Sequence, residues 1–257
     1  MYSENPDNDV DARMQQPPHP TLTRHYKDGA ERRSLLNRWF DSTAPHYDSI
    51  NRILSLGTGD RYRKEALLRA GAATGMQFLD VGCGTGSIAA HAKRIVQPGG
   101  QVIALDPSRQ MLRLATVDRV ADAVQGLAEW LPFREKTFDM LAMGYALRHV
   151  EDLQLTFREY MRVLKPGGVL LLLEFIRPPS GPFYQLVKYY LRNVAPAVTR
   201  LLTRNREAQA LMVYHWETVE SCVGPETIVE VLRRVGFEHI DVHLTLGFFG
   251  EYTATKP

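Results

Sequence analysis

The feature that most constrains the fold is a regular alternation of short apolar strands with helices across the middle of the chain. Runs of apolar residues predict five strands, at residues 77–81, 101–105, 121–125, 137–143 and 169–175. Helical segments separate them, at residues 87–96, 108–117 and 153–164. Strands that alternate with helices of this length form βαβ units around a parallel sheet. The run Val169–Leu173 is apolar at every position, as a strand covered on both faces requires.

Two helical regions lie outside this alternation. Apolar residues from Leu35 onward recur at helical spacing and begin an N-terminal helical cap over residues 31–75, in which a second helical segment covers roughly residues 49–68. A mostly helical insertion follows the fifth strand at about residues 182–224. Residues 1–30 contain few apolar side chains that could be buried, so we expect them to form a tail.

The C-terminal part of the chain supplies the last strands. Residues 225–235 predict a helix that begins with a proline and ends before Gly236. Residues 240–244 and 250–255 alternate apolar and polar side chains, which predicts a closing hairpin near one edge of the sheet. Together with the five parallel strands, this predicts a doubly wound, seven-stranded, Rossmann-like α/β domain over residues 76–257.

The composition narrows the class of protein. The 257 residues include 31 basic and 29 acidic side chains, and this formal net charge of +2 argues against a dedicated nucleic-acid binder. Two cysteines, Cys83 and Cys222, are too few for a disulfide framework. The longest stretch without a charged side chain, Val81–Ala92, is too short to cross a bilayer, and no basic-then-apolar leader opens the chain. We therefore expect a cytoplasmic protein that needs no metal or disulfide to fold.

The most informative motif is the loop Asp80–Gly86, which follows the first strand and opens a helix. Glycines there let the backbone turn tightly and approach a ligand, and the helix N-terminus offers unpaired N–H groups. Asp106 ends the second strand, where a carboxylate can accept both hydrogens of a ribose diol. A nucleoside-containing cofactor is therefore expected at the carboxyl ends of the first two strands.

Two cofactors fit such a loop. Gly84–Ala89 satisfies G-x-G-x-x-A, the dinucleotide fingerprint. However, Asp80 precedes three glycines at every second position, and its carboxylate suits a cofactor with an ammonium group and would repel a pyrophosphate. This spacing resembles the cofactor loop of class I S-adenosylmethionine (SAM) methyltransferases. A glycine-rich turn without a ligand is the structural alternative.

The resemblance to these methyltransferases extends along the chain. Glu129–Phe133, followed by Thr137–Asp139, is similar to their segment beside the adenine, and Arg158–Gly168 to their helix and turn before the fifth strand. The resemblance implies SAM as the cofactor and an antiparallel seventh strand at the edge of the sheet. The residues expected to bind the cofactor are Tyr47, Asp80, Gly82, Gly84, Thr85, Gly86, Asp106, Pro107, Met111, Leu127, Ala128 and Gly144.

Two segments resemble a narrower family, the ubiquinone/menaquinone-biosynthesis C-methyltransferases. Phe40–Asn51 is similar to an N-terminal segment of that family, and Tyr145–Val150 to its aromatic-Gly-Leu-Arg-Asn-Val signature. The similarity covers about residues 35–257 and implies that the substrate is a lipophilic prenylated quinol, methylated on a ring carbon. The chain departs from the family pattern at Leu127 for an Asn, at Gly144 for a Ser and at His149 for an Asn. It also has Gly82-Cys83-Gly84, the more general methyltransferase form, where the family has Ala-Gly-Gly.

The expected chemistry is transfer of a methyl group to a ring carbon that is held in line with it. We expect Arg148 to stabilise a phenolate and to orient a water that takes the proton. His149 is the second catalytic candidate because imidazole titrates near neutrality, and its alternative role is to cap the following loop. Tyr47 is expected to close over the cofactor, unless it is a core aromatic. The residues expected to bind substrate are Tyr145, Arg148, Tyr214 and His215, of which His215 fits a structural role equally well.

Other functions remain to be separated from this one. Methyltransferases that act on adenine in DNA or RNA carry Asn/Asp-Pro-Pro-Tyr/Phe after the fourth strand, where this chain has Gly144–Leu147, so no nucleic-acid partner is expected. A secondary-metabolite O-, N- or C-methyltransferase that acts on a soluble small molecule is the alternative enzyme. A non-catalytic SAM-binding module is the third interpretation.

The insertion begins with an unusual charge pattern. Between Phe175 and Arg206 there are six basic and no acidic residues, interleaved with aromatic residues and leucines. A basic helical stretch of this kind can rest on an anionic membrane surface, or it can be a lid helix with solvated charges. We expect a peripheral membrane contact through residues 175–206 at the inner face of the membrane, and the sequence leaves a homodimer open.

Overall fold

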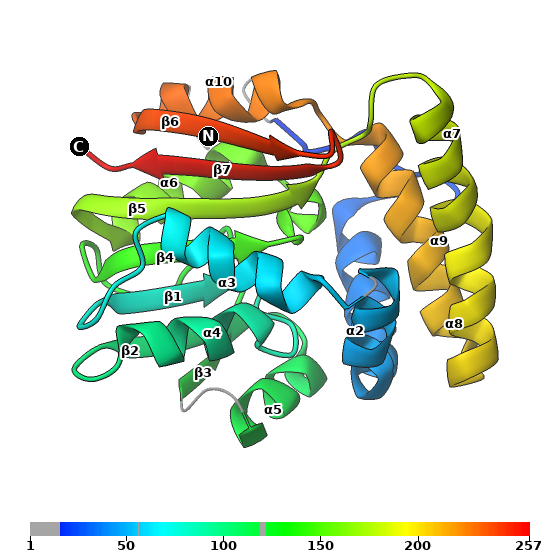
Figure 1. The fold of residues 1–257 in the computed structure, drawn as a ribbon, viewed down its shortest axis with the longest axis horizontal. Coiled ribbons are helices and arrows are strands. Elements are labelled where there is room, and N and C mark those ends of the chain that lie inside the picture. The colour runs from blue at the N-terminus through cyan, green and yellow to red at the C-terminus, as the bar shows by residue number, and fades with distance from the viewer. Residues whose placement is uncertain (1–15, 56, 119–121) are drawn as a thin grey trace, which may run out of the picture.

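The computed structural model describes residues 16–55, 57–118 and 122–257, and its centre is a seven-stranded sheet (Figure 1). The strands are β1 (Gln77–Val81), β2 (Gln101–Asp106), β3 (Asp122–Gln125), β4 (Phe138–Gly144), β5 (Leu164–Phe175), β6 (Glu238–Thr245) and β7 (Phe249–Thr255). Their order is β3-β2-β1-β4-β5-β7-β6, and the first five are parallel. The prediction of a doubly wound, seven-stranded α/β fold is confirmed.

The last strand departs from the expectation that it lies at the edge. β7 is antiparallel to both of its neighbours, as expected, but it lies between β5 and β6, and β6 forms the edge. Tyr252 and Ala254 of β7 are buried, whereas Asp241 and His243 of β6 are exposed. The strand with buried side chains therefore takes the inner place, and the polar strand takes the edge, where its charges oppose pairing with another chain.

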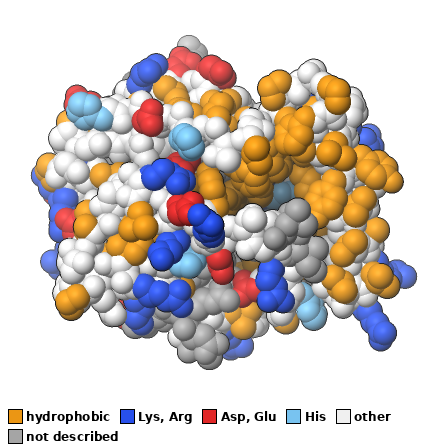
Figure 2. All heavy atoms as spheres, viewed as in Figure 1, with side chains coloured by type: hydrophobic (Ala, Val, Ile, Leu, Met, Phe, Trp, Pro, Cys, Tyr) orange, Lys and Arg blue, Asp and Glu red, His pale blue; other side chains and the backbone are white. Residues whose placement is uncertain are grey.

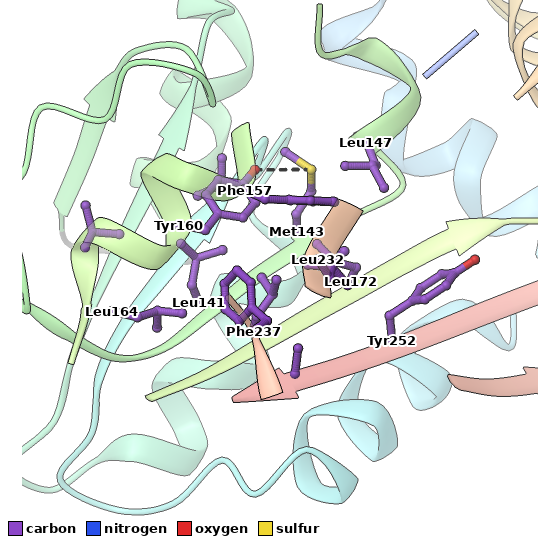
Figure 3. Close-up of a cluster of buried hydrophobic side chains, with 14 of the residues drawn as sticks. Leu141, Met143, Leu147, Phe157, Tyr160, Leu164, Leu172, Leu232, Phe237 and Tyr252 are labelled. Carbon is purple, nitrogen blue, oxygen red and sulfur yellow. Dashed lines mark hydrogen bonds between the residues drawn. The ribbon is translucent and has the colours of Figure 1, made fainter. Parts of the chain in front are cut away.

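Helices cover both faces of the sheet (Figure 1). On one face lie α3 (Gly59–Arg69), α4 (Ser87–Val96) and α5 (Arg109–Asp118), and on the other lie α6 (Leu153–Val163) and α10 (Pro225–Val235). Adjacent residues of β1 serve both faces, because Phe78 packs on the α3–α4 side and Leu79 on the α6–α10 side. Figure 3 shows the α6–α10 side, where the Tyr160 hydroxyl lies 3.4 Å from the Met143 sulfur and Leu232 comes in from α10.

One long helix, α2 (Gly29–Leu54), opens the helical cap. The second helical segment, expected at about residues 49–68, therefore begins later than predicted, at Gly59, and is α3. Gly57 lies between the two helices at a φ of 78°, a left-handed conformation that a right-handed helix cannot continue through.

Residues 16–28 lie against the domain and do not form the expected tail. The backbone N–H of Gln16 donates to the Asp152 carboxylate at 2.7 Å, and the ring of Tyr26 is buried beside α2. Composition alone cannot predict individual contacts such as these, because it describes only how many apolar side chains a segment has. Residues 1–15, the rest of the predicted tail, lie outside the described residues.

The insertion after β5 is helical, as predicted. It contains α7 (Pro182–Tyr189), a π-helical turn (Tyr190–Val194), α8 (Ala195–Thr203) and α9 (Arg206–Ser221). α9 packs on α2 through Tyr214, Leu36 and Trp39, so the insertion and α2 form one helical layer beside the sheet, whereas α3, the other helix of the predicted cap, lies on the sheet (Figure 1). Within the described ranges, none of the helices combines the length and the apolar character needed to cross a membrane.

Candidate active site

The glycine loop after β1 has the backbone that its sequence requires. Gly82, Gly84 and Gly86 have φ values of 65°, 54° and 81°, which only glycine adopts without strain. A Cβ on Gly82 would lie 2.8 Å from the Cβ of Ala146, and one on Gly84 would lie 3.7 Å from Cε1 of Tyr47. The loop therefore stays bare on the side that faces the end of β4 and Tyr47.

Asp80 carries a buried carboxylate oxygen without a partner. Its Oδ2 accepts a hydrogen bond from the backbone N–H of Ala89 at 2.9 Å, whereas Oδ1 is buried and has no hydrogen-bond partner among the described residues. Burial raises the pKa of the Asp80 carboxyl to about 8. An unpartnered carboxylate oxygen at a cavity wall fits the ammonium group of SAM, so the residues present suit this cofactor.

The pKa of Asp80 predicts a pH-dependent cofactor affinity. The ammonium group favours the ionised carboxylate, so below pH 8 binding must displace the proton that the raised pKa retains in the cofactor-free protein. We expect the affinity for S-adenosylhomocysteine to fall as the pH is lowered, approaching about tenfold per pH unit. Isothermal titration calorimetry from about pH 8 to about pH 6 measures it, and Asp80→Asn should abolish the dependence. An equal slope in Asp80→Asn would contradict the assignment.

Asp106 holds the glycine loop in this structure. Its Oδ2 accepts from the backbone N–H of Gly84 and its Oδ1 from that of Ser108, both at 2.8 Å. Burial raises the pKa of the Asp106 carboxyl to about 6. Each of these oxygens has a second lone pair, so it can accept a hydrogen bond from a ribose hydroxyl while it still accepts one from the backbone.

Helix α2 crosses the carboxyl ends of β1 and β2 and is fastened there by two hydrogen bonds, one to the glycine loop and one to the turn after β2. The Asp48 carboxylate accepts a hydrogen bond from the Thr85 hydroxyl, and the Asp41 carboxylate accepts one from the Ser108 hydroxyl at 2.5 Å. Tyr47 lies between these two carboxylates in the sequence and over Gly84 in space. The structure therefore brings Tyr47 to the loop, as predicted, and adds two acidic residues that motif comparison had not singled out.

A cavity of about 360 Å³ joins the loop to the helical insertion, and Figure 2 shows hydrophobic side chains gathered around a hollow on this side of the molecule. Predicted site residues that line it are Tyr47, Asp80, Gly82, Gly84, Thr85, Gly144, Tyr145, Arg148, His149 and His215. Other predicted residues do not line it, namely Gly86, Asp106, Pro107, Met111, Leu127, Ala128 and Tyr214. Its apolar lining includes Phe40, Ile88, Phe175, Leu191, Leu211, Met212, Phe248 and Phe249.

Tyr214 is the one predicted substrate residue that the structure turns away from the cavity. Its side chain is fully buried between α2 and α9, in contact with Trp39 and His25. His215 follows it on α9 and does reach the cavity, because successive helical side chains point about 100° apart. Tyr214 instead supports His149, whose ring stacks on it at 5.8 Å.

Arg148 is held by a carboxylate that sequence comparison had missed. Arg148 lies in the short 3₁₀ turn after β4, and its Nη1 donates to Oε1 of Glu174, near the end of β5, at 2.5 Å. The two side chains are 4% and 1% exposed. The only signal for this partner was an acidic residue at the end of the most apolar strand, Val169–Phe175.

The ion pair also fixes the protonation of His215. Nη2 of Arg148 lies 2.8 Å from Nδ1 of His215, and a guanidinium can only donate, so Nδ1 accepts and the ring hydrogen is on Nε2. Burial, and then the charge of Arg148, hold the pKa of His215 well below its ordinary value. His215 is therefore a neutral imidazole that can donate one hydrogen bond from Nε2.

His149 is neutral for the same reasons but is not fixed in the same way. Burial first, and then Arg148 and Arg32, lower its pKa well below the ordinary histidine value. Its Nδ1 is buried with no hydrogen-bond partner in the described part of the chain, and its ring meets Phe40 edge-on at 5.5 Å. The following helix is capped by Asp152, which accepts a hydrogen bond from Leu155 N–H, and the other role predicted for His149, to cap the loop before Glu151, stays a prediction.

Comparison with known proteins identifies the family. The sequence matches the ubiE/COQ5 methyltransferase family over residues 27–256. The chain belongs to this family. It is 33% identical over 210 residues to a demethylmenaquinone methyltransferase of Lactococcus lactis, a match that covers 79% of this chain and 81% of that protein. It is 30% identical over 219 residues to a ubiquinone/menaquinone biosynthesis C-methyltransferase of Idiomarina loihiensis, covering 82% and 86%.

Solved structures agree with the fold of a ubiE/COQ5 family member. A phosphoethanolamine N-methyltransferase of Haemonchus contortus, solved with SAM, has a TM-score of 0.63 at 20% identity, covering 88% of this chain and 60% of that one. A SAM-dependent methyltransferase of Aquifex aeolicus has a TM-score of 0.57 at 18% identity, covering 81% and 98%. The chain is a SAM-dependent methyltransferase with the fold that its sequence predicted.

Proposed function

We propose that this enzyme methylates a ring carbon of a prenylated quinol. The observation that carries the proposal is one cavity that has the cofactor loop at one side, the Arg148–His215 pair at another and apolar walls between them. A quinol has the matching chemistry, because it presents polar hydroxyls on an apolar ring and tail. The names of the relatives, which act on menaquinone and ubiquinone precursors, support the same substrate class.

In the proposed mechanism SAM, when bound, supplies an activated methyl group. His215 donates from Nε2 to one ring oxygen and so orients the quinol, and Arg148, held by Glu174, keeps His215 in that tautomer. His149 takes the phenolic proton on a ring nitrogen, which makes the neighbouring ring carbon nucleophilic. After transfer, that carbon releases its own hydrogen to water as a proton, the ring regains aromaticity as a phenolate, and His149 returns the phenolic proton to the oxygen. In this mechanism Arg148 acts through His215, which differs from the sequence-based expectation that it stabilises a phenolate and orients a water.

The proposal is tested by turnover with SAM and a chemically reduced, demethylated prenylquinol. We expect methylated product from the quinol and none from the same compound in its oxidised form, which has no phenolic proton to lose. Turnover confined to a soluble phenol or amine would instead favour the secondary-metabolite enzyme. SAM binding without turnover on any of these acceptors would favour a binding module.

A second proposal concerns a membrane contact through which a lipophilic substrate could reach the cavity. Five large apolar side chains of α7 and α8, which we call the apolar ridge, are exposed: Phe183, Leu186, Tyr189, Leu201 and Leu202. Figure 2 shows hydrophobic side chains gathered on the side of the molecule where α7 and α8 lie. Arg192, Arg204 and Arg206 on the same segment are exposed as well. We propose that this ridge rests on an anionic membrane, with the aliphatic side chains in the headgroup boundary.

Vesicle flotation tests this contact. We expect the protein to float with vesicles that contain anionic lipid, and the double variant Leu186→Ser/Leu201→Ser to stay behind. Leu244→Ser, at an exposed leucine of β6, is the matched control and should float normally. If the wild-type protein floats with neither neutral nor anionic vesicles, the proposal is overturned.

A further inference from the structure

Of the five described Arg, Asp and Glu side chains that line the cavity, three are paired within the protein. Three arginines line it: Arg148 pairs with Glu174, and Arg61 pairs with Glu65 at 2.7 Å. The third, Arg63, makes no ion pair with any residue that the structure describes. On the acidic side Glu65 is used by Arg61, which leaves the unpartnered Oδ1 of Asp80.

Arg63 lies at the cofactor side of the cavity. It is on the first turns of α3, and its guanidinium carbon lies 5.3 Å from the centre of the Tyr145 ring, just after the end of β4. The positive charge of Arg63 acts on Asp80, where it partly offsets the rise in pKa that burial causes. A Cβ on Gly59 would lie 2.8 Å from Nη1 of Arg63, so the glycine leaves room for the side chain to lie back along the helix.

We propose that Arg63 binds the carboxylate of the methionine part of SAM, while Asp80 binds its ammonium group. The ammonium and carboxylate groups of an amino acid are attached to one carbon. The guanidinium of Arg63 and Oδ1 of Asp80, which lie on the same cavity wall, can therefore bind these two groups together. A guanidinium suits a carboxylate because its planar N–H groups can bond both oxygens. The contact with the Tyr145 ring holds the guanidinium in place when no carboxylate is bound.

The proposal concerns the cofactor and does not depend on which acceptor is methylated. Its test compares two ligands that differ in one group: S-adenosylhomocysteine and its decarboxylated analogue, S-adenosyl-3-thiopropylamine. Both keep the ammonium group, the sulfur and the nucleoside. We expect Arg63→Met to weaken binding of S-adenosylhomocysteine by about 10- to 100-fold, the range for a hydrogen bond to a charged group, and to leave the analogue's affinity unchanged. Calorimetric titration of each ligand measures it.

Two further variants complete the experiment. Lys64→Met removes an exposed cation of the same helix that does not line the cavity, so the affinities for both ligands should stay at the wild-type values. Arg63→Lys keeps the charge but not the paired N–H groups, and should restore part of the lost affinity. The ratio of the two affinities within one variant does not depend on how much of that variant is folded. An Arg63→Met protein with the wild-type ratio would overturn the proposal.

Discussion

Replacing Glu174 with Gln is expected to lower the free energy of unfolding by about 3–5 kcal/mol, because Arg148 is then left as a buried charge without a counter-ion. The side chains of Arg148 and Glu174 are 4% and 1% exposed, so water cannot replace the lost carboxylate. The variant should also lose turnover, since Arg148 would no longer be held where it fixes the tautomer of His215. Urea-induced unfolding followed by circular dichroism measures the stability.

The neighbouring strand offers a matched control. Glu251 on β7 faces Leu173 in the register with β5 and pairs with Arg69, whose side chain is 42% exposed. Glu251→Gln removes a carboxylate of the same kind, but Arg69 keeps contact with water, so the loss of stability should be smaller. Equal losses of stability in the two variants would contradict the claim that breaking the buried Arg148–Glu174 pair costs more than breaking a partly exposed pair.

Replacing His149 with Ala is expected to lower kcat by about 10²- to 10⁴-fold, the range for loss of a positioned general base. Because the pKa of His149 lies well below the ordinary histidine value, its ring stays neutral as the pH falls through 6.5. The kcat of the wild-type enzyme should therefore show no drop at that pH. Single-turnover rates over a series of pH values measure both effects, with S-adenosylhomocysteine affinity as the check that the variant is folded.

His149→Asn distinguishes a base from a positioning residue. Asparagine keeps a polar side chain of similar size at this place, and it is the residue that the family signature carries there, but it cannot take up a proton. If His149 is the base, His149→Asn should be as slow as His149→Ala. A wild-type rate in His149→Asn would mean that the imidazole only fills the space between Phe40 and Tyr214.

The sequence was most informative where function depends on neighbours along the chain. Asp80 lies near the end of β1, the glycine loop follows that strand, and the turn at Arg148 comes soon after β4. A strand followed by glycines can be recognised from the residues alone. Parallel strands then bring their carboxyl ends to one edge, so Asp80 and Arg148 had to approach the same region. Tyr47 was found through its segment, and the structure places it over Gly84.

What the sequence did not predict depends on contacts between distant residues. In the sequence, Glu174 and Arg63 are ordinary charged residues. Glu174 is important because Arg148 lies beside it, and Arg63 is important because it forms no ion pair with any described residue. Tyr214 was misplaced because two consecutive residues on a helix point to different sides, and only the packing of α9 on α2 decides which side faces the cavity.

The measurement that most directly tests the central claim is the position of the transferred methyl group. The enzyme would be given SAM labelled with ¹³C in the methyl group and a reduced, demethylated prenylquinol, and the product would be examined by NMR and mass spectrometry. The account predicts a ¹³C-methyl group bonded to a ring carbon next to a phenolic oxygen. A label found on oxygen, as a methyl ether, would contradict the proposed methylation of carbon, because a phenolate can react at either atom and only the placement of the ring in the cavity selects the carbon.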